Sequence, residues 1–162
     1  ASIAEQKQRF RSTANKEFAL QQHAERVAAL DPTQFRVYQS IQTWSNQCAT
    51  LPPLRLLVLG TAGTGKTFTL KCAVEAARMA WNSFESVLLT AHTGVAAVNM
   101  GGGAATINSI FKMGGNNADV DLDGDRLEEL VEELSETKLV IIDEISTVGA
   151  AQFEMVSRTY MF

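Results

Sequence analysis

The chain is organised around an apolar run that breaks into glycines and then resumes as a helical pattern. This stretch, residues 54–70, reads LRLLVLGTAGTGKTFTL. It matches the GxxxxGK[ST] spacing of a phosphate-binding loop, in which glycines adopt positive φ and bring backbone N–H groups close to phosphate oxygens. The helix that follows directs the positive end of its dipole at the same anion. The sequence therefore predicts a nucleotide-binding loop made of Gly60, Thr61, Ala62, Gly63, Thr64, Gly65, Lys66 and Thr67.

The last two residues of this loop have distinct chemical roles. Lys66 is expected to reach the β- and γ-phosphates of ATP, and the Thr67 hydroxyl is a hard oxygen ligand for Mg²⁺. The flanks favour a strand–loop–helix unit. Residues 56–59 form a short apolar run typical of a strand buried on both faces, and residues 68–79 contain neither Gly nor Pro. The competing interpretation, a glycine turn without a ligand, is less favoured because a chance match to this spacing is rare.

Composition limits the class of protein. The 162 residues are 46% hydrophobic and 20% charged, which is an ordinary globular balance for one domain. The net charge of −4 gives no basic footprint, so any contact with nucleic acid must depend on local geometry. Cys48 and Cys72 lack the spacing of a metal site or a disulfide scaffold, and they favour a reducing compartment. We expect an intracellular location, the nucleus or mitochondrion in a eukaryote. No apolar stretch is long enough to span a bilayer.

The residues before the loop predict helices. Residues 1–30 are expected to form a helical arm ahead of a domain over residues 31–162, and its thin apolar face fits either packing on that domain or a solvated extension. Asp31 and Pro32 then mark a helix start, as N-cap and first helical residue. Gln34 has two possible roles: it completes a capping box with Asp31, or its amide reads the edge of adenine.

The residues after the loop predict an alternation of strands and helices. Strands are expected over residues 87–90 and 139–142, and helices over residues 94–100, 127–134 and 150–160, with a glycine link at 101–103, a cap at Thr106 and a polar loop over residues 114–125. This order predicts an α/β fold with a parallel sheet and right-handed crossovers.

Two carboxylates follow the strand predicted over residues 139–142. Ligands of open parallel sheets bind outside the carboxyl ends of the strands, so Asp143 and Glu144 are expected to face the nucleotide. Asp143 would hold Mg²⁺ through water, and Glu144 would polarise the attacking water as a general base. A pair of helix-capping carboxylates is the competing interpretation.

Three blocks together resemble the Pif-type, RecD-like DNA helicases of superfamily 1: GTAGTGKT at residues 60–67, TAHTGVAAVNMGG at 90–102 with TINSIF at 106–111, and LVIIDEIS at 139–146. The resemblance implies an incomplete RecA-like P-loop NTPase domain that uses ATP and Mg²⁺. It also implies 5′-to-3′ movement on single-stranded DNA, a monomer, and work in DNA repair, recombination and telomere maintenance.

The same resemblance implies roles for individual residues. Gln34 takes the adenine-reading role. Thr93 with Gly94, and Thr106 with Asn108, occupy two segments that contact DNA phosphates, which position the strand without reading its sequence. The chain departs from the family pattern in having Asn108 where His is usual, His92 where Pro is common and Thr147 where Met is common.

The resemblance also implies parts that these 162 residues do not contain. They are a strand carrying a glutamine sensor, which would lie between the strands at residues 54–59 and 139–142, a second RecA-like domain and its arginine. We therefore expect the chain as given to bind Mg·ATP weakly and to neither hydrolyse it at motor rates nor unwind DNA. Two alternatives remain: a shortened nucleotide-binding paralogue without turnover, and another P-loop ATPase or nucleotide kinase.

Overall fold

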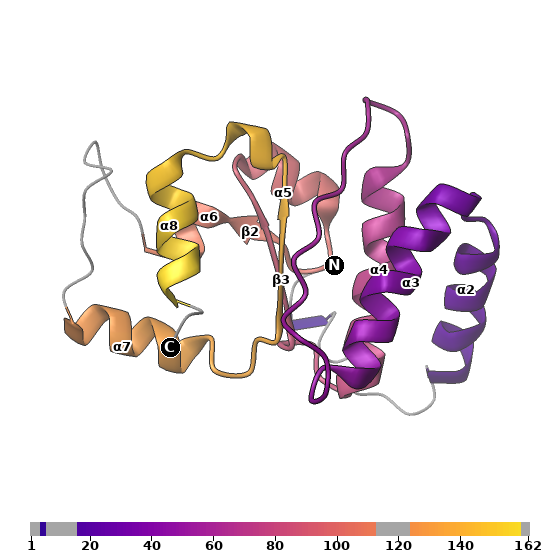
Figure 1. Cartoon of the computed structure of the whole chain (residues 1–162), viewed down its shortest axis with the longest axis horizontal. Helices are drawn as coiled ribbons and strands as arrows, with labels where there is room; N and C mark the ends of the chain where they lie inside the picture. The colour runs from indigo at the N-terminus through magenta and orange to yellow at the C-terminus, as the bar shows by residue number, and fades with distance from the viewer. Residues whose placement is uncertain (1–3, 6–15, 113–123, 160–162) are drawn as a thin grey trace. The chain divides into compact units, whose positions relative to one another are not determined.

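The computed structural model describes residues 4–5, 16–112 and 124–159 (Figure 1). The chain divides into two compact units, Ala1–Val87 and Leu88–Phe162. The elements, in chain order, are α2 (Lys16–Ala28), α3 (Pro32–Gln47), α4 (Lys66–Trp81), β1 (Val87–Ala91), α5 (Gly94–Met100), β2 (Ala105–Thr106), α6 (Ile107–Ile110), α7 (Gly124–Glu133), β3 (Leu139–Asp143), a 3-10 turn (Ile145–Thr147) and α8 (Ala150–Thr159).

The first unit is built from α2, α3 and α4, which lie side by side (Figure 1). The start of α3 is as predicted. Asp31 Oδ1 accepts from the backbone N–H groups of Thr33 and Gln34, and Gln34 Oε1 accepts from Asp31 N–H at 3.1 Å, which completes a capping box. The helices α3 and α4 are in extensive contact, and their buried residues include Tyr38 and Ile41 of α3 and Cys72, Ala73 and Ala77 of α4.

A polar network attaches α2 to the other two helices. His23 is buried, with Nδ1 3.0 Å from Glu75 Oε2 and Nε2 3.2 Å from Tyr38 Oη. Arg26 Nη2 donates to the same Glu75 oxygen at 2.8 Å, and Gln42 Nε2 donates to Tyr38 Oη at 2.8 Å. Of the two possibilities for the N-terminal arm, packing on the neighbouring helices is therefore the one found for α2. Residues 1–3 and 6–15 of the predicted arm lie outside the described residues.

The end of α4 is held by a buried cation. Arg78 Nε donates to Phe84 O at 2.9 Å and Nη2 donates to Val87 O at 3.1 Å, while its guanidinium lies 3.7 Å from the centre of the Phe84 ring. Burial lowers the pKa of Arg78 to about 10. These contacts fix the turn between α4 and β1.

The prediction of a buried strand over residues 54–59 is wrong. This run has no regular secondary structure, and three of its leucines are exposed, Leu56 by 44%, Leu57 by 64% and Leu59 by 81%. A strand needs a neighbour for its backbone N–H and C=O groups, and the described sheet, β2-β1-β3, does not include this run. Apolar composition alone therefore did not specify a strand.

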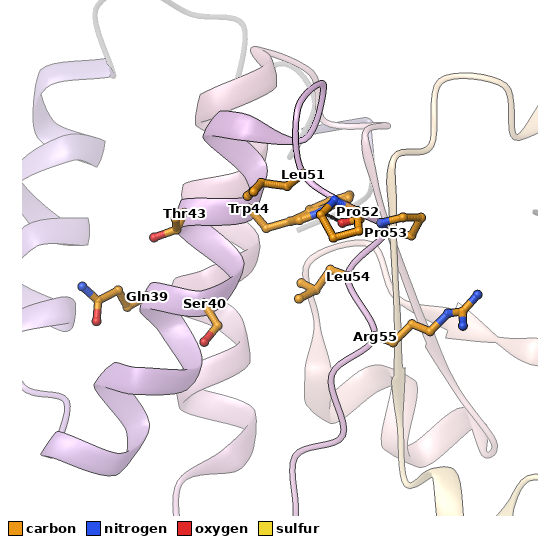
Figure 2. A pocket seen from close by; sticks show the side chains of 9 residues that line it. All are labelled: Gln39, Ser40, Thr43, Trp44, Leu51, Pro52, Pro53, Leu54 and Arg55. Carbon is orange, nitrogen blue, oxygen red and sulfur yellow. Dashed lines mark hydrogen bonds between the residues drawn. The ribbon is translucent and has the colours of Figure 1, made fainter.

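A groove runs along α3 where the chain leaves that helix (Figure 2). Trp44 forms one wall, and its indole N–H donates to Pro52 O at 2.9 Å. Trp44 also packs edge-on against Trp81, with ring centres 5.9 Å apart. The groove shares no lining residue with the predicted nucleotide loop; its lining consists of Gln39, Ser40, Thr43, Trp44, Leu51, Pro52, Pro53, Leu54 and Arg55.

The second unit contains most of a three-stranded parallel sheet with the order β2-β1-β3. Thr90 pairs with Ala105 across β1 and β2, and its hydroxyl donates to Ile141 O of β3 at 3.3 Å. The predicted α/β class and the strands that became β1 and β3 are confirmed. The core contributed by α6, α7 and α8 contains Ile107, Phe111, Leu130 and Val156.

The glycine link and the predicted helices of this unit are also found. Gly101, Gly102 and Gly103 all have positive φ, from +63° to +84°, so the chain turns sharply between α5 and β2. Most of the predicted polar loop over residues 114–125 lies outside the described residues, and its last two residues, Gly124 and Asp125, belong to α7 instead. The two compact units meet after Val87, whereas the sequence predicted a helical arm that ends at residue 30 and a RecA-like domain after it. Compact units and family domains are different divisions, so the predicted domain boundary stays a prediction. None of the helices in residues 4–5, 16–112 and 124–159 has the length and apolar character that crossing a bilayer requires.

Candidate functional site

The predicted phosphate loop has the backbone conformation that its glycines permit. Gly63 and Gly65 have φ of +79° and +75°, values that residues with a Cβ rarely adopt. A Cβ on Gly65 would lie 2.5 Å from Gln34 Nε2, and one on Gly60 would lie 2.8 Å from Thr64 Oγ1. A side chain at Gly65 would be strained by its φ and would displace the Gln34 amide, and one at Gly60 would displace the Thr64 hydroxyl.

Lys66 and Thr67 begin α4 directly behind the loop. Gly65 is the N-cap of α4 and supplies no side-chain hydrogen bond, so the first N–H groups of the helix are not capped by it. Lys66 Nζ donates to Gly60 O at 2.7 Å and to Thr61 O at 2.9 Å, which holds the ammonium group over the loop. Glycine conformation, an uncapped helix start and a held cation together fit the phosphates of a nucleotide.

Gln34 connects this loop to α3. Its Oε1 completes the capping box with Asp31, and its Nε2 donates to Thr64 O at 3.0 Å. The structural role considered for Gln34 is therefore present, with a contact to the loop that was not anticipated. One Nε2 proton remains beyond the bond to Thr64, so the amide keeps a donor for a further partner.

The carboxylates predicted to act on metal and water lie where β3 ends. Asp143 is half-buried, and its Oδ1 accepts from Glu144 N–H at 2.9 Å. Glu144 is exposed and has φ +55°, a left-handed conformation that costs a non-glycine residue about 1 kcal/mol or more. The Glu144 side chain does not cap the following 3-10 turn, so the capping interpretation lacks support for Glu144. Strained conformations of this kind are concentrated at functional sites.

The residues predicted to contact DNA lie at two short helices of the second unit. Thr93 is the N-cap of α5 and Thr106 is the N-cap of α6, each hydroxyl accepting a backbone N–H at 3.2 Å. Gly94 is the first residue of α5 and Asn108 lies in α6. A hydroxyl that accepts a hydrogen bond keeps its own proton for donation, so the capping role of both threonines is compatible with a phosphate contact.

Sequence reasoning missed Gln152 of α8. Its Nε2 donates to Asn108 Oδ1 at 2.6 Å, and its Oε1 accepts from Gly149 N–H at 2.9 Å. Gln152 and Asn108 are 44 positions apart, and Gln152 belongs to none of the motif blocks, so no local pattern indicated it.

The structure thus brings the predicted residues together in two groups. Gln34, the loop and Lys66 belong to the first unit, whereas Asp143, Glu144 and the predicted DNA contacts belong to the second. That both groups meet at one nucleotide stays a prediction.

Comparison with known families agrees with the motif blocks. The family model described as PIF1-like helicase matches residues 29–161, which is most of the chain. Searches of the curated proteins and of the solved structures return no significant match. The family match covers the loop, both predicted DNA segments and the carboxylate pair, and on this basis the chain belongs to the PIF1-like helicase family.

Proposed function

We propose that the chain binds ATP with Mg²⁺ through the loop at residues 60–67 and belongs to a motor that moves 5′-to-3′ along single-stranded DNA. Family membership supports the helicase class. Nucleotide binding is supported most directly by Lys66, whose ammonium group is held by Gly60 O and Thr61 O above glycines with positive φ. A lysine satisfied by two neutral carbonyls gains from exchanging them for charged phosphate oxygens.

The residues of the first unit would bind and orient the nucleotide. The loop N–H groups and Lys66 hold the phosphates, and the second Nε2 proton of Gln34 is available to the adenine edge. Thr67 of the first unit and Asp143 of the second are the oxygen donors proposed to hold Mg²⁺, a hard cation that prefers oxygen ligands. When bound, the ion neutralises negative charge on the phosphates.

Glu144 would supply the base for hydrolysis. Its exposed carboxylate takes a proton from the attacking water, a role that needs an ionised group held in place. The left-handed backbone at Glu144 and the bond from its N–H to Asp143 Oδ1 fix the direction in which both side chains leave the strand.

The second unit would hold the DNA backbone. Thr93, Gly94, Thr106 and Asn108 offer hydroxyl, backbone and amide protons, which suit phosphate oxygens and read no sequence. Such contacts do not need the basic surface that a chain of net charge −4 lacks.

Two other functions compete with this proposal. A nucleotide-binding paralogue without turnover would keep the loop and have no need of Glu144. Another P-loop ATPase is disfavoured by the family match, which extends well beyond the loop to residue 161.

The test is a titration of a fluorescent ATP analogue with Mg²⁺ into the chain and two variants. Lys66→Ala is expected to weaken binding at least about tenfold, because it removes a charged hydrogen-bond donor from the phosphates. Lys71→Ala is the matched control, an exposed lysine of the same helix outside the loop, and is expected to bind like the parent. Equal affinity of Lys66→Ala and the parent contradicts the nucleotide site.

A further inference from the structure

We infer that Gln152 is a positioning residue, which turns the Asn108 amide so that its NH₂ group faces a DNA phosphate. The inference rests on the proposed contact between Asn108 and DNA, and it adds a residue outside the motif blocks to that contact. It starts from the bond between Gln152 Nε2 and Asn108 Oδ1, 2.6 Å long.

The orientation of both amides follows from one backbone group. Gly149 N–H can only donate, so the Gln152 atom facing it at 2.9 Å must be the oxygen Oε1. The other end of the Gln152 amide is then the NH₂ group, which faces Asn108. The Asn108 atom that meets it must accept, and is therefore Oδ1. A backbone N–H thus determines, through Gln152, which end of the Asn108 amide is left for another partner.

The end that is left is a donor. Asn108 is exposed, and its Nδ2 has no hydrogen-bond partner within the ranges that the structure describes. Phosphate oxygens only accept, so an amide that presents NH₂ attracts the backbone of DNA, whereas one that presents oxygen repels it. The orientation of this amide therefore decides the sign of the interaction.

The pair has a rigid base. Ile107, which precedes Asn108, packs in the same buried core as Val156, one turn after Gln152 on α8. Phe111 belongs to that core as well. Because the core fixes α6 against α8 within the second unit, the distance between the two amides depends on packing already present before DNA binds.

The first part of the test uses three variants in a titration of fluorescein-labelled oligothymidylate, followed by anisotropy. Asn108→Ala is expected to weaken binding about three- to tenfold, which is the value of one hydrogen bond. Gln152→Glu still accepts from Gly149 N–H, but its second oxygen requires a donor and so turns the Asn108 amide over. We expect a loss as large as that of Asn108→Ala. Gln152→Leu leaves the Asn108 amide free to rotate but does not reverse it, so a smaller loss of DNA affinity is expected.

The second part asks what causes the loss of DNA affinity: the orientation of the Asn108 amide, the charge that Gln152→Glu adds, or the lost bond from Gly149 N–H to Gln152 at the start of α8. In the Asn108→Ala background, Gln152→Leu is expected to cause no further loss of DNA affinity, and Gln152→Glu at most a small one, because the amide through which they act is gone. If either substitution costs as much there as in the parent, the positioning role is wrong. If Asn108→Ala binds DNA like the parent, or the parent does not bind it, the proposed DNA contact itself is wrong.

A measurement without DNA tests the pair directly. In the ¹⁵N–¹H spectrum of the free protein, the side-chain NH₂ signals of Gln152 are expected to shift in Asn108→Ala, and those of Asn108 to shift in Gln152→Leu. Unchanged signals would overturn the inference whatever the DNA titration shows. Thermal melting accompanies each variant, and Gln152→Glu covers the case in which Gln152→Leu fails to fold, because it keeps the bond to Gly149.

Discussion

Gln34 Nε2 and Thr64 O, thirty positions apart in the sequence, are joined by a hydrogen bond of 3.0 Å. The same side chain accepts from Asp31 N–H, so one amide both caps α3 and holds the phosphate loop. These two structural roles of Gln34 can be separated by substitution, because the cap uses Oε1 and the contact with the loop uses Nε2.

Gln34→Glu is expected to separate these duties. The carboxylate still accepts from Asp31 N–H, as glutamate does in a capping box, but it cannot donate to Thr64 O. We expect nucleotide affinity to fall about three- to tenfold. We expect the melting temperature to stay about 2–4 °C above that of Gln34→Ala, which loses the cap as well.

Gln39→Glu is the control for the added charge, since it lies on the exposed face of the same helix. A fluorescent ATP titration and a thermal melt on all three variants provide the measurements. If Gln39→Glu weakens nucleotide binding as much as Gln34→Glu, the donor protons of the Gln34 amide, to Thr64 O and to the adenine edge, are irrelevant to the ligand.

The loop glycines are expected to respond unequally to alanine. Gly63→Ala meets no atom within 4 Å and has only the strain of φ +79°, about 1–2 kcal/mol. Gly65→Ala has similar strain and also places its Cβ 2.5 Å from Gln34 Nε2, so the larger loss of nucleotide affinity is expected there. Part of that loss should disappear in a Gln34→Ala background. An identical loss with and without Gln34 would show that the steric conflict is unimportant.

Elements with local signals were predicted well. The start of α3 follows from an Asp cap and Pro at the first helical position, and β3 follows from four apolar residues ahead of Asp143. The helix α5 was predicted over residues 94–100, ahead of the glycine link, and in the structure Thr93 is its cap. In each of these cases the residues that determine the element lie within it or next to it.

Features that depend on distant residues were not predicted. The run at residues 54–59 has the composition of a strand, but composition supplies no neighbour, and the run stays irregular and exposed. The bond between Gln152 and Asn108 joins two helices that meet only through the folded core. The left-handed backbone at Glu144 breaks the usual preference of glutamate, so no propensity indicated it.

Glu144→Gln is expected to preserve Mg·ATP affinity and to remove turnover. The amide has the shape of the carboxylate but cannot take a proton from water, and general bases contribute about 10²- to 10⁴-fold to rates. The measurement is steady-state phosphate release with single-stranded DNA in a full-length version that contains the second RecA-like domain, alongside the nucleotide titration. Glu128→Gln, an exposed carboxylate on α7, removes the same charge and is expected to change neither quantity. A normal rate in Glu144→Gln would assign the base to another residue.

Alkaline pH is expected to destabilise the first unit through Tyr38 and Cys72. Burial, and then the nearby Cys72, raise the pKa of Tyr38 above its ordinary value of 10.0, although the bond from Gln42 lowers it. Burial, and then the Glu75 carboxylate, raise the pKa of Cys72 above its ordinary value of 9.0. Both groups therefore keep their protons in the folded chain at pH values where the unfolded chain has lost them.

The sign of the effect follows from this difference in proton binding. At Tyr38 and Cys72, above the ordinary values, the unfolded state binds fewer protons than the folded state, so the contribution of these two groups to the free energy of unfolding falls as pH rises. Arg78 contributes with the opposite sign, because its pKa is lowered in the folded state. The stabilising contribution of Tyr38 and Cys72 is complete below pH 9.0 and is lost as pH rises through the raised values. Urea unfolding at about pH 8 and about pH 11 measures the fall.

Tyr38→Phe lacks one of the two titrating groups and should lose less stability between these pH values. The variant is expected to be less stable than the parent at both pH values, because it no longer bonds His23. If parent and variant lose the same amount, Tyr38 does not contribute to the pH dependence.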